Sequence, residues 1–320
     1  MKKISICLCF MFGIVAALHA AEPLFQFLSP TADVCLYFTT RNTEKNIDKN
    51  LWKKVQQDSK AAAALQYDEE EDDAADPIAN LLEKIRDKDG SAVFNVFILS
   101  LTSPSIVIEG VAEVSCNLGT ELEKIRNQNA SLERIQTKPS TVYQCKRGRD
   151  LDVTILVEKP EIIHFRISLN FDNPIPFGPI KPYKQPLKMP DIDLRDPMFI
   201  VNSHLDQIGR IMHPADEKAA ELKQILLDIP NCFLTGRVED KQLKLTALAE
   251  CKDENTAAQF REKLNSGFRE FQQIEAATRI FSDLKVRNSD GSTIYLEGDF
   301  ELENAWDFMK SLPSGLANEE

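Results

Sequence analysis

Beyond the first twenty residues, three histidines are the side chains best suited to acid–base or metal chemistry: His164, His204 and His213. His164 alternates with Ile162 and Arg166 in a strand-like run, so we expect a packed imidazole there and not a general base. His204 and His213 are nine residues apart, so they do not share a helical face as zinc-binding i, i+4 ligands would. We interpret both as residues that flank and cap a helix.

Nucleophilic catalysis has no recognisable signature in this sequence. GxSxG, HExxH, P-loop and GxGxxG patterns do not occur. Ser203, His204 and Asp206 form the closest grouping of nucleophile, base and acid, but adjacent residues on a strand point to opposite faces, so Ser203 and His204 cannot pair as in a triad. The sequence therefore predicts no catalytic residue and no cofactor-binding residue.

The cysteines also give no sign of a metal or redox centre. None has a CxxC partner, and all five lie inside or at the ends of apolar, strand-like runs, where cysteine behaves as a small buried hydrophobe. The five are Cys35, Cys116, Cys145, Cys232 and Cys251. An odd number leaves at least one thiol over in an exported protein, and the pairing stays open.

An acidic run, YDEEEDDAADP at residues 67–77, is the most highly charged stretch. Consecutive acids on an extended chain point away from one another, and glycine is absent from 68–76, so we expect a solvated loop and no metal site. Two Asp-Gly turns, at Gly90 and Gly291, resemble the middle of a calcium loop. Their first ligand position would be Ile85 or Val286, which cannot bind calcium, so we interpret both as turns before strands.

The N-terminus has the order of a secretory signal peptide. Two lysines precede an apolar run over residues 4–18, and small residues follow at Ala20 and Ala21. We predict cleavage near Ala20, which removes residues 1–20, and an extracytoplasmic (periplasmic or secreted) mature protein without a further spanning segment. The formal charge then falls from −12 to −14, because two lysines and no acid are removed. Such acidity argues against nucleic acid as a partner.

Hydrophobic periodicity divides the mature chain into two α+β units of mainly antiparallel sheet, each with helices covering one face. We place the first unit at residues 22–171, with the acidic insertion near 67–76, and the second at 197–312, followed by a tail at 313–320. Strands are predicted at 33–40, 91–101, 105–116, 140–145, 151–159 and 161–169, and then at 197–204, 231–239, 242–251, 281–287 and 292–302. Helices are predicted at 43–66, 77–87, 117–128, 205–212, 215–228, 303–312 and over about 25 residues from 253.

The two units follow the same order of elements, which predicts an internal duplication. The strands that end at Cys116 and Cys251 are each followed directly by a helix. Between the units, residues 172–196 are rich in proline, which excludes helix or central strand and favours a semi-rigid linker. The linker also carries the basic residues Lys181, Lys184 and Lys188 in an otherwise acidic chain.

The chain resembles uncharacterised exported bacterial proteins that repeat a module of strand, dipeptide turn, strand and long amphipathic helix. The residues that carry the resemblance are GRVEDKQLKLTALAECKDENTAAQFREKL (236–264) and SDGSTIYLEGDF (289–300). The resemblance implies a duplicated α+β domain and supplies no activity, cofactor or site residue.

Three functions are compatible with these patterns. The first is a non-enzymatic extracytoplasmic protein that binds or scaffolds envelope or secreted partners. The second is a carrier for an apolar or lipid-like ligand held between sheet and helices, which the 18 phenylalanines permit. The third is a hydrolase with a dispersed site, so the question of enzymatic activity stays open.

Overall fold

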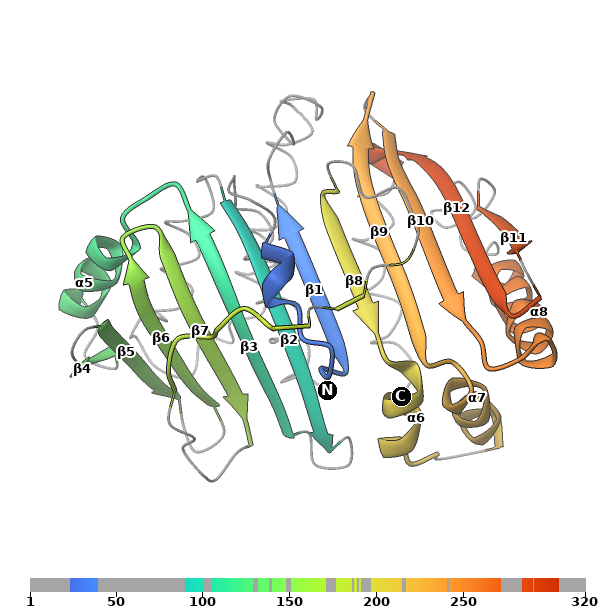
Figure 1. Cartoon of the computed structure of the whole chain (residues 1–320), viewed down its shortest axis with the longest axis horizontal. Helices are drawn as coiled ribbons and strands as arrows, with labels where there is room; N and C mark the ends of the chain where they lie inside the picture. The colour runs from blue at the N-terminus through green and yellow to red at the C-terminus, as the bar shows by residue number, and fades with distance from the viewer. Residues whose placement is uncertain are drawn as a thin grey trace. The chain divides into compact units, whose positions relative to one another are not determined.

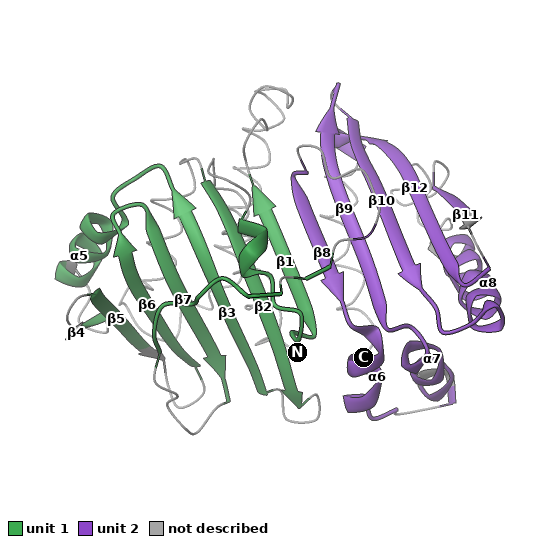
Figure 2. Cartoon of the chain, viewed as in Figure 1, with its two compact units in different colours: residues 1–41, 56–189 green, residues 42–55, 190–320 purple. Residues whose placement is uncertain are grey.

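The protein divides into two compact units, which Figure 2 colours separately. Unit 1 comprises residues 1–41 and 56–189, and unit 2 comprises residues 42–55 and 190–320. The computed structural model describes residues 24–39, 90–100, 105–128, 132–137, 140–147, 151–170, 177–185, 187–188, 190, 197–214, 217–240, 242–271, 284–289 and 291–304. The predicted leader, the acidic run, the two helices predicted between 43 and 87, and the predicted helix beyond residue 304 lie outside these residues.

The described part of unit 1 is built on an antiparallel sheet with the strand order β1-β2-β3-β7-β6-β5-β4 (Figure 1). The strands are β1 (Val34–Thr39), β2 (Gly90–Ser100), β3 (Ser105–Val114), β4 (Leu132–Thr137), β5 (Ser140–Arg147), β6 (Leu151–Lys159) and β7 (Ile162–Leu169). The prediction of a mixed α+β fold with antiparallel pairing is confirmed. The sequence analysis missed β4, because three successive exposed residues, Glu133, Arg134 and Ile135, interrupt the apolar alternation.

One face of this sheet packs against helix α5 (Leu118–Gln128). Alternate residues of the strands, such as Phe94, Ile108 and Phe165, form a buried core with Leu122 and Ile125 of the helix. Side chains of a strand alternate between faces, so these residues all come from one side of the sheet. The largest buried apolar cluster of unit 1 lies on this face of the sheet.

The opposite face of the unit 1 sheet is buried as well. The sequence analysis expected cover by helices on one face only. Val93, Val111 and Leu156 on this face are almost completely inaccessible. The short 3₁₀ helix η1 (Leu24–Phe27) and the proline-rich segment 177–188, which we call the strap, lie over it (Figure 1). The strap lies in the predicted linker, and its described residues form neither helix nor strand, as its prolines require.

Unit 2 has its own antiparallel sheet, in the order β8-β9-β10-β12-β11. Its elements are β8 (Phe199–Ser203), α6 (Leu205–Ile211), α7 (Glu217–Leu227), β9 (Asn231–Glu239), β10 (Gln242–Glu250), α8 (Glu254–Phe271), β11 (Lys285–Ser289) and β12 (Thr293–Glu301). Ile225, Ile229, Ala257 and Ile294 form a buried cluster between the helices and the sheet. The apolar stripe predicted for the long helix is confirmed at Ala257, Phe260 and Leu264.

The core of unit 2 is less closed than that of unit 1. Strand alternation places Leu243, Leu245, Ala247 and Ala249 of β10 on one face of the sheet. Only Ala249 of these four is fully buried, whereas Leu248 on the opposite face is buried with its cross-strand neighbour Phe233. Within the described residues, no helix is both long enough and apolar enough to span a bilayer.

Both sheets contain a glycine that lies directly opposite a phenylalanine on the neighbouring strand. Gly110 on β3 pairs with Phe165 on β7, and Gly236 on β9 pairs with Phe199 on β8. A Cβ atom on either glycine would overlap the phenylalanine ring. The aromatic ring therefore lies over the glycine backbone, a packing that fills the space left by the missing side chain.

We expect Gly110→Ala to lower the free energy of unfolding by about 2–3 kcal/mol, because the new methyl group would overlap the Phe165 ring and the Val93 carbonyl oxygen. Urea denaturation followed by circular dichroism measures the change. Gly267→Ala in α8 is the matched control: its Cβ would meet no heavy atom within 4 Å, so it should stabilise by about 0.5–1 kcal/mol. Equal stability of the two variants would contradict this account of Gly110.

Candidate functional site

The face of unit 1 beneath the strap holds a buried histidine with a partner on each ring nitrogen. His164 on β7 is 1% exposed, and the strand alternation places it on the face opposite α5. Its Nε2 lies 2.5 Å from Glu158 Oε2, and its Nδ1 accepts the Ile180 backbone N–H at 3.1 Å. The ring of Phe27 meets it edge-on at 6.5 Å between centroids. His164 is therefore packed, as the sequence analysis expected, and both of its ring nitrogens take part in hydrogen bonds.

Arg166, two residues further along β7, lies on the same face. Its Nε donates to Glu109 Oε1 on β3 at 2.8 Å, and a second guanidinium nitrogen reaches the same oxygen. The guanidinium carbon also lies 4.9 Å from the centre of the Phe177 ring in the strap, a cation–π contact. His164 and Arg166 thus hold the strap through one hydrogen bond and one ring contact.

A second polar cluster joins α5 to β4 and β5 in unit 1. The Glu123 carboxylate accepts from the Tyr143 hydroxyl at 2.7 Å, from Arg126 Nε at 3.0 Å and from Arg134 at 3.0 Å. The groove beside it has a volume of about 380 Å³ and is lined by Asn117, Gly119, Thr120, Glu123, Arg134, Thr141, Tyr143 and Val157. The tyrosine hydrogen bond is the main reason why the pKa of Glu123 is lowered. Burial, followed by the Glu123 contact, raises the pKa of Tyr143 to about 12.

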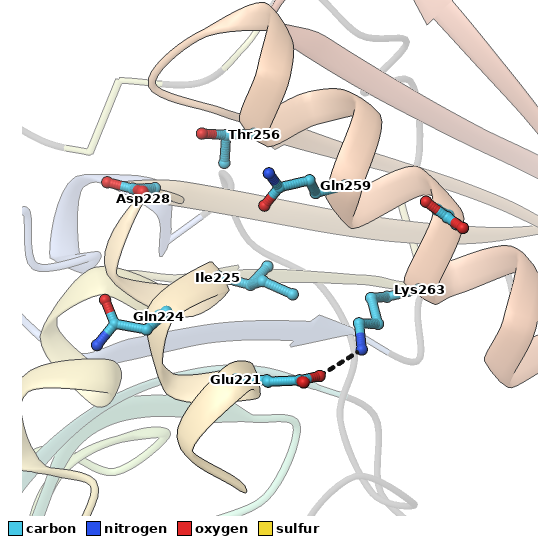
Figure 3. Close-up of a pocket in the computed structure, with 8 residues that line it drawn as sticks. Glu221, Gln224, Ile225, Asp228, Thr256, Gln259 and Lys263 are labelled. Atoms are coloured by element: carbon cyan, nitrogen blue, oxygen red, sulfur yellow. Dashed lines mark hydrogen bonds and ion pairs between the residues drawn. The ribbon is translucent and has the colours of Figure 1, made fainter. Parts of the chain in front are cut away.

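In unit 2, a groove of about 340 Å³ lies between α7 and α8 (Figure 3). Seven of its eight lining residues are of polar or charged type, although much of the surface they present is their apolar carbon: Glu221, Gln224, Ile225, Asp228, Thr256, Gln259, Glu262 and Lys263. Glu221 and Lys263 form an ion pair of 2.8 Å between the two helices, and both side chains are 57% exposed. Their contact lowers the pKa of Glu221 and raises that of Lys263. A pair this exposed contributes little stability, so the groove offers hydrogen bonds to a ligand and no activated group.

No disulfide bond joins any two of the five cysteines, all of which lie among the described residues: Cys35, Cys116, Cys145, Cys232 and Cys251. Burial raises the pKa of Cys35 to about 12, and burial likewise raises the pKa values of Cys232 and Cys251 to about 11. These three thiols are therefore protonated at neutral pH and poor nucleophiles. Cys35 donates instead to the Ser29 carbonyl oxygen at 3.0 Å.

Two of the remaining histidine and aspartate candidates, His204 and Asp206, have structural partners. His204 occupies the N-cap position of α6 as expected, but its side chain makes no capping bond; its Nδ1 donates to the Pro230 carbonyl oxygen at 3.1 Å. Asp206 pairs with Arg210 at 2.9 Å, one turn along the helix. His213 is exposed beyond the end of α6. These positions do not assemble a triad with Ser203.

Metal ligands do not converge among the described residues, where no group of three or more His, Cys, Asp or Glu side chains could hold an ion. Gly291 has φ 71° in the turn between β11 and β12, which confirms the interpretation of this Asp-Gly sequence as a turn. Gly90 is the first residue of β2. Asp68 to Asp76 lie outside the described residues.

One buried polar side chain, which the sequence analysis did not single out, lacks partners. Asn202 on β8 is completely buried, and within the described part of the chain neither its amide oxygen nor its amide nitrogen has a hydrogen-bond partner. Asn95 on β2 is equally buried but fully bonded: its oxygen accepts from the Ser29 N–H at 2.8 Å, and its nitrogen donates to the Phe27 carbonyl at 2.9 Å. Only the surroundings, which the sequence does not reveal, distinguish the two asparagines.

Comparison with known proteins gives no family. No protein-family model matches the chain, and no curated protein matches it. The solved structures that resemble it include crystal form III of TP0453, with a TM-score of 0.46 and 12% identity over 91% of this chain and 99% of that chain. Crystal form IV of TP0453 gives 0.45 and 12% over 91% and 97%, and crystal form I gives 0.41 and 13% over 92% and 98%. Fold does not imply function, so these structures assign no activity to the chain.

We expect Tyr143→Phe to cost about 1–2 kcal/mol of stability at pH 7, because it removes the hydrogen bond to an ionised carboxylate. A lowered pKa stabilises the fold above the ordinary value of 4.5 and loses its effect as the pH falls through the folded value. The difference between variant and wild type should therefore shrink below about pH 4. Chemical denaturation from pH 3 to pH 8 tests this, and a difference that is independent of pH would contradict it.

We expect Asn202→Leu to stabilise the protein by about 1–3 kcal/mol, because it replaces a buried, unbonded amide with an apolar group of similar volume. Asn95→Leu is the matched control, since it removes a bonded amide at the same burial, and it should destabilise by a similar amount. Thermal and urea denaturation measure both. Destabilisation by Asn202→Leu would show instead that the amide has a bound partner.

Proposed function

We propose that the protein is a non-enzymatic extracytoplasmic binding protein, and that an apolar part of its ligand packs on the sheet of unit 2. Export rests on the leader pattern at residues 1–20, with cleavage near Ala20. The ligand-contacting surface is the unit 2 apolar row, defined as Leu234, Leu243, Leu245, Ala247 and Leu296. This proposal combines the binding and the carrier hypotheses of the sequence analysis.

The half-buried state of the unit 2 apolar row carries the proposal. The register places these side chains on one face: Leu234 opposite Ala247 on β10, Ala247 opposite Leu296 on β12, and Leu245 and Leu243 two and four residues before Ala247. All five keep part of their surface accessible. In unit 1, by contrast, the α5-facing residues Phe94, Ile108 and Phe165 are at most 5% exposed. Leu243 and Leu245 pack against the buried Phe300 and keep part of their surface accessible. Contiguous accessible apolar surface is one feature that marks binding sites.

The ionisable groups of the described residues support binding over catalysis. His164 has both nitrogens bonded, Glu123 accepts three bonds, and the three thiols with raised pKa values are protonated at neutral pH. An enzyme needs at least one such group in reach of the substrate with a pKa close to the working pH. No described feature favours the hydrolase hypothesis.

We further infer that the two units arose by duplication, as the order of elements predicts. In support, β2 and β3 form a hairpin after β1, and β7 then pairs with the outer side of β3. In the same way, β9 and β10 form a hairpin after β8, and β12 pairs with the outer side of β10. A crystal structure in which β1–β3 with β7 do not superpose on β8–β10 with β12 would contradict the inference.

The binding proposal is tested with 1-N-phenylnaphthylamine, an apolar fluorescent probe whose emission rises in an apolar environment. We expect saturable binding by the full mature protein and at least about tenfold weaker binding by Leu245→Lys, since a lysine in the row is costly to bury. Leu99→Lys in unit 1 is the control, because Leu99 is 54% exposed and outside the row. Both variants must keep the wild-type circular dichroism spectrum.

Equal probe binding by all three proteins, or no binding by any, would contradict the proposal. Mass spectrometry then separates the two kinds of ligand. A small apolar molecule carried through native purification supports a carrier, whereas cross-links from the row to one envelope or secreted protein support a scaffold.

A further inference from the structure

The strap is held on unit 1 by a small number of polar contacts. The Ile180 N–H donates to His164 Nδ1 at 3.1 Å, the Tyr183 N–H donates to the Gln26 carbonyl oxygen at 2.8 Å, and Phe177 stacks near Arg166 at 4.9 Å. Its described residues have no helical or strand hydrogen bonds of their own. These three contacts fix residues 177–183 of the strap, and Leu187, which is 9% exposed, adds apolar burial further along it.

The Ile180 contact requires one protonation state of His164. A backbone N–H can only donate, so Nδ1 must carry a lone pair. The ring proton then resides on Nε2 and is donated to Glu158 Oε2 at 2.5 Å. The neutral Nε2–H tautomer is thus the form of His164 that binds the strap, assigned from its partners.

A second proton on the ring would turn the Nδ1 acceptor into a donor. Two N–H groups would then face each other across the Ile180 contact, and a ring that is 1% exposed leaves no room for water to separate them. We propose that His164 is a proton-operated latch: the neutral ring holds the strap on the sheet, and protonation of Nδ1 releases it.

The charged groups around His164 favour a protonated ring with the strap released over a ring that stays neutral. Glu158 on β6 is 44% exposed and stabilises the imidazolium through its Nε2 bond, which protonation leaves in place. Arg166 on β7 is neutralised by Glu109 of β3. From η1, the ring meets only the Phe27 edge, and the strap brings Lys181 and Lys184, both exposed to solvent. The proton is thus held by Glu158 while the strap loses its acceptor.

Amide hydrogen exchange of the full mature protein tests the latch at about pH 7.5 and about pH 5, which bracket the range where histidine changes charge. After correction for the intrinsic pH dependence of exchange, we expect protection in the peptide covering residues 177–185 to fall at least about tenfold at the lower pH, since each lost bond opens the strap to solvent. The β3–β7 amides, such as that of Phe165, serve as the internal control and should keep their protection.

Three variants separate the latch from general acid loosening. His164→Asn keeps an acceptor near the Nδ1 position and does not titrate, so the strap should stay protected at both pH values. His164→Phe removes the acceptor, so the strap should exchange rapidly at both. Glu158→Gln keeps the hydrogen bond without the negative charge, and the loss of protection should move to lower pH.

His213→Asn is the matched control, because His213 is exposed and lies in unit 2. It should show the wild-type transition. Strap protection that is the same at both pH values in the wild type, or a transition that persists in His164→Asn, would overturn the proposal.

Discussion

The sheet of unit 1 is covered on both faces, and this constraint determines much of the rest. One face is covered by α5, whose backbone is satisfied within the helix. The other is covered by η1 and the strap, which have few backbone hydrogen bonds of their own. Buried N–H and C=O groups need partners. Two side chains on the second face supply such partners. Asn95 binds the backbone of Ser29 and Phe27, and His164 binds the backbone of Ile180.

Alternation of apolar residues was sufficient to predict most of the strands, because it reports burial on one or both faces directly. The start of the helix after Cys251 and the bounds of the hairpin before it were predicted within one residue. The strand β4 was missed, since an edge strand needs little apolar surface. The role of the strap was also missed, because proline excludes helix and strand but does not say what an extended segment packs against. His164 was correctly predicted to be packed, yet its partner Ile180 lies 16 residues away and only folding brings the two together.

The two units use the same local devices with different outcomes. Each places a phenylalanine over a cross-strand glycine, and each packs helices on one face of its sheet. Unit 1 has the larger buried core, whereas the row from Leu234 to Leu296 in unit 2 remains partly accessible. This difference supports the proposal that the apolar row of unit 2 contacts the ligand. The polar cluster of Glu123 and Tyr143 lies in unit 1.

The strand β4 ends the described strand order of unit 1, and it is short and polar. Its Glu133 and Arg134 side chains are exposed, and Arg134 is tied back to Glu123 on α5. A long, flat, apolar edge would invite strands of other molecules to add to the sheet and start a fibre. Charge at this edge opposes the addition of strands from other molecules and so protects the sheet of unit 1 against amyloid-like growth.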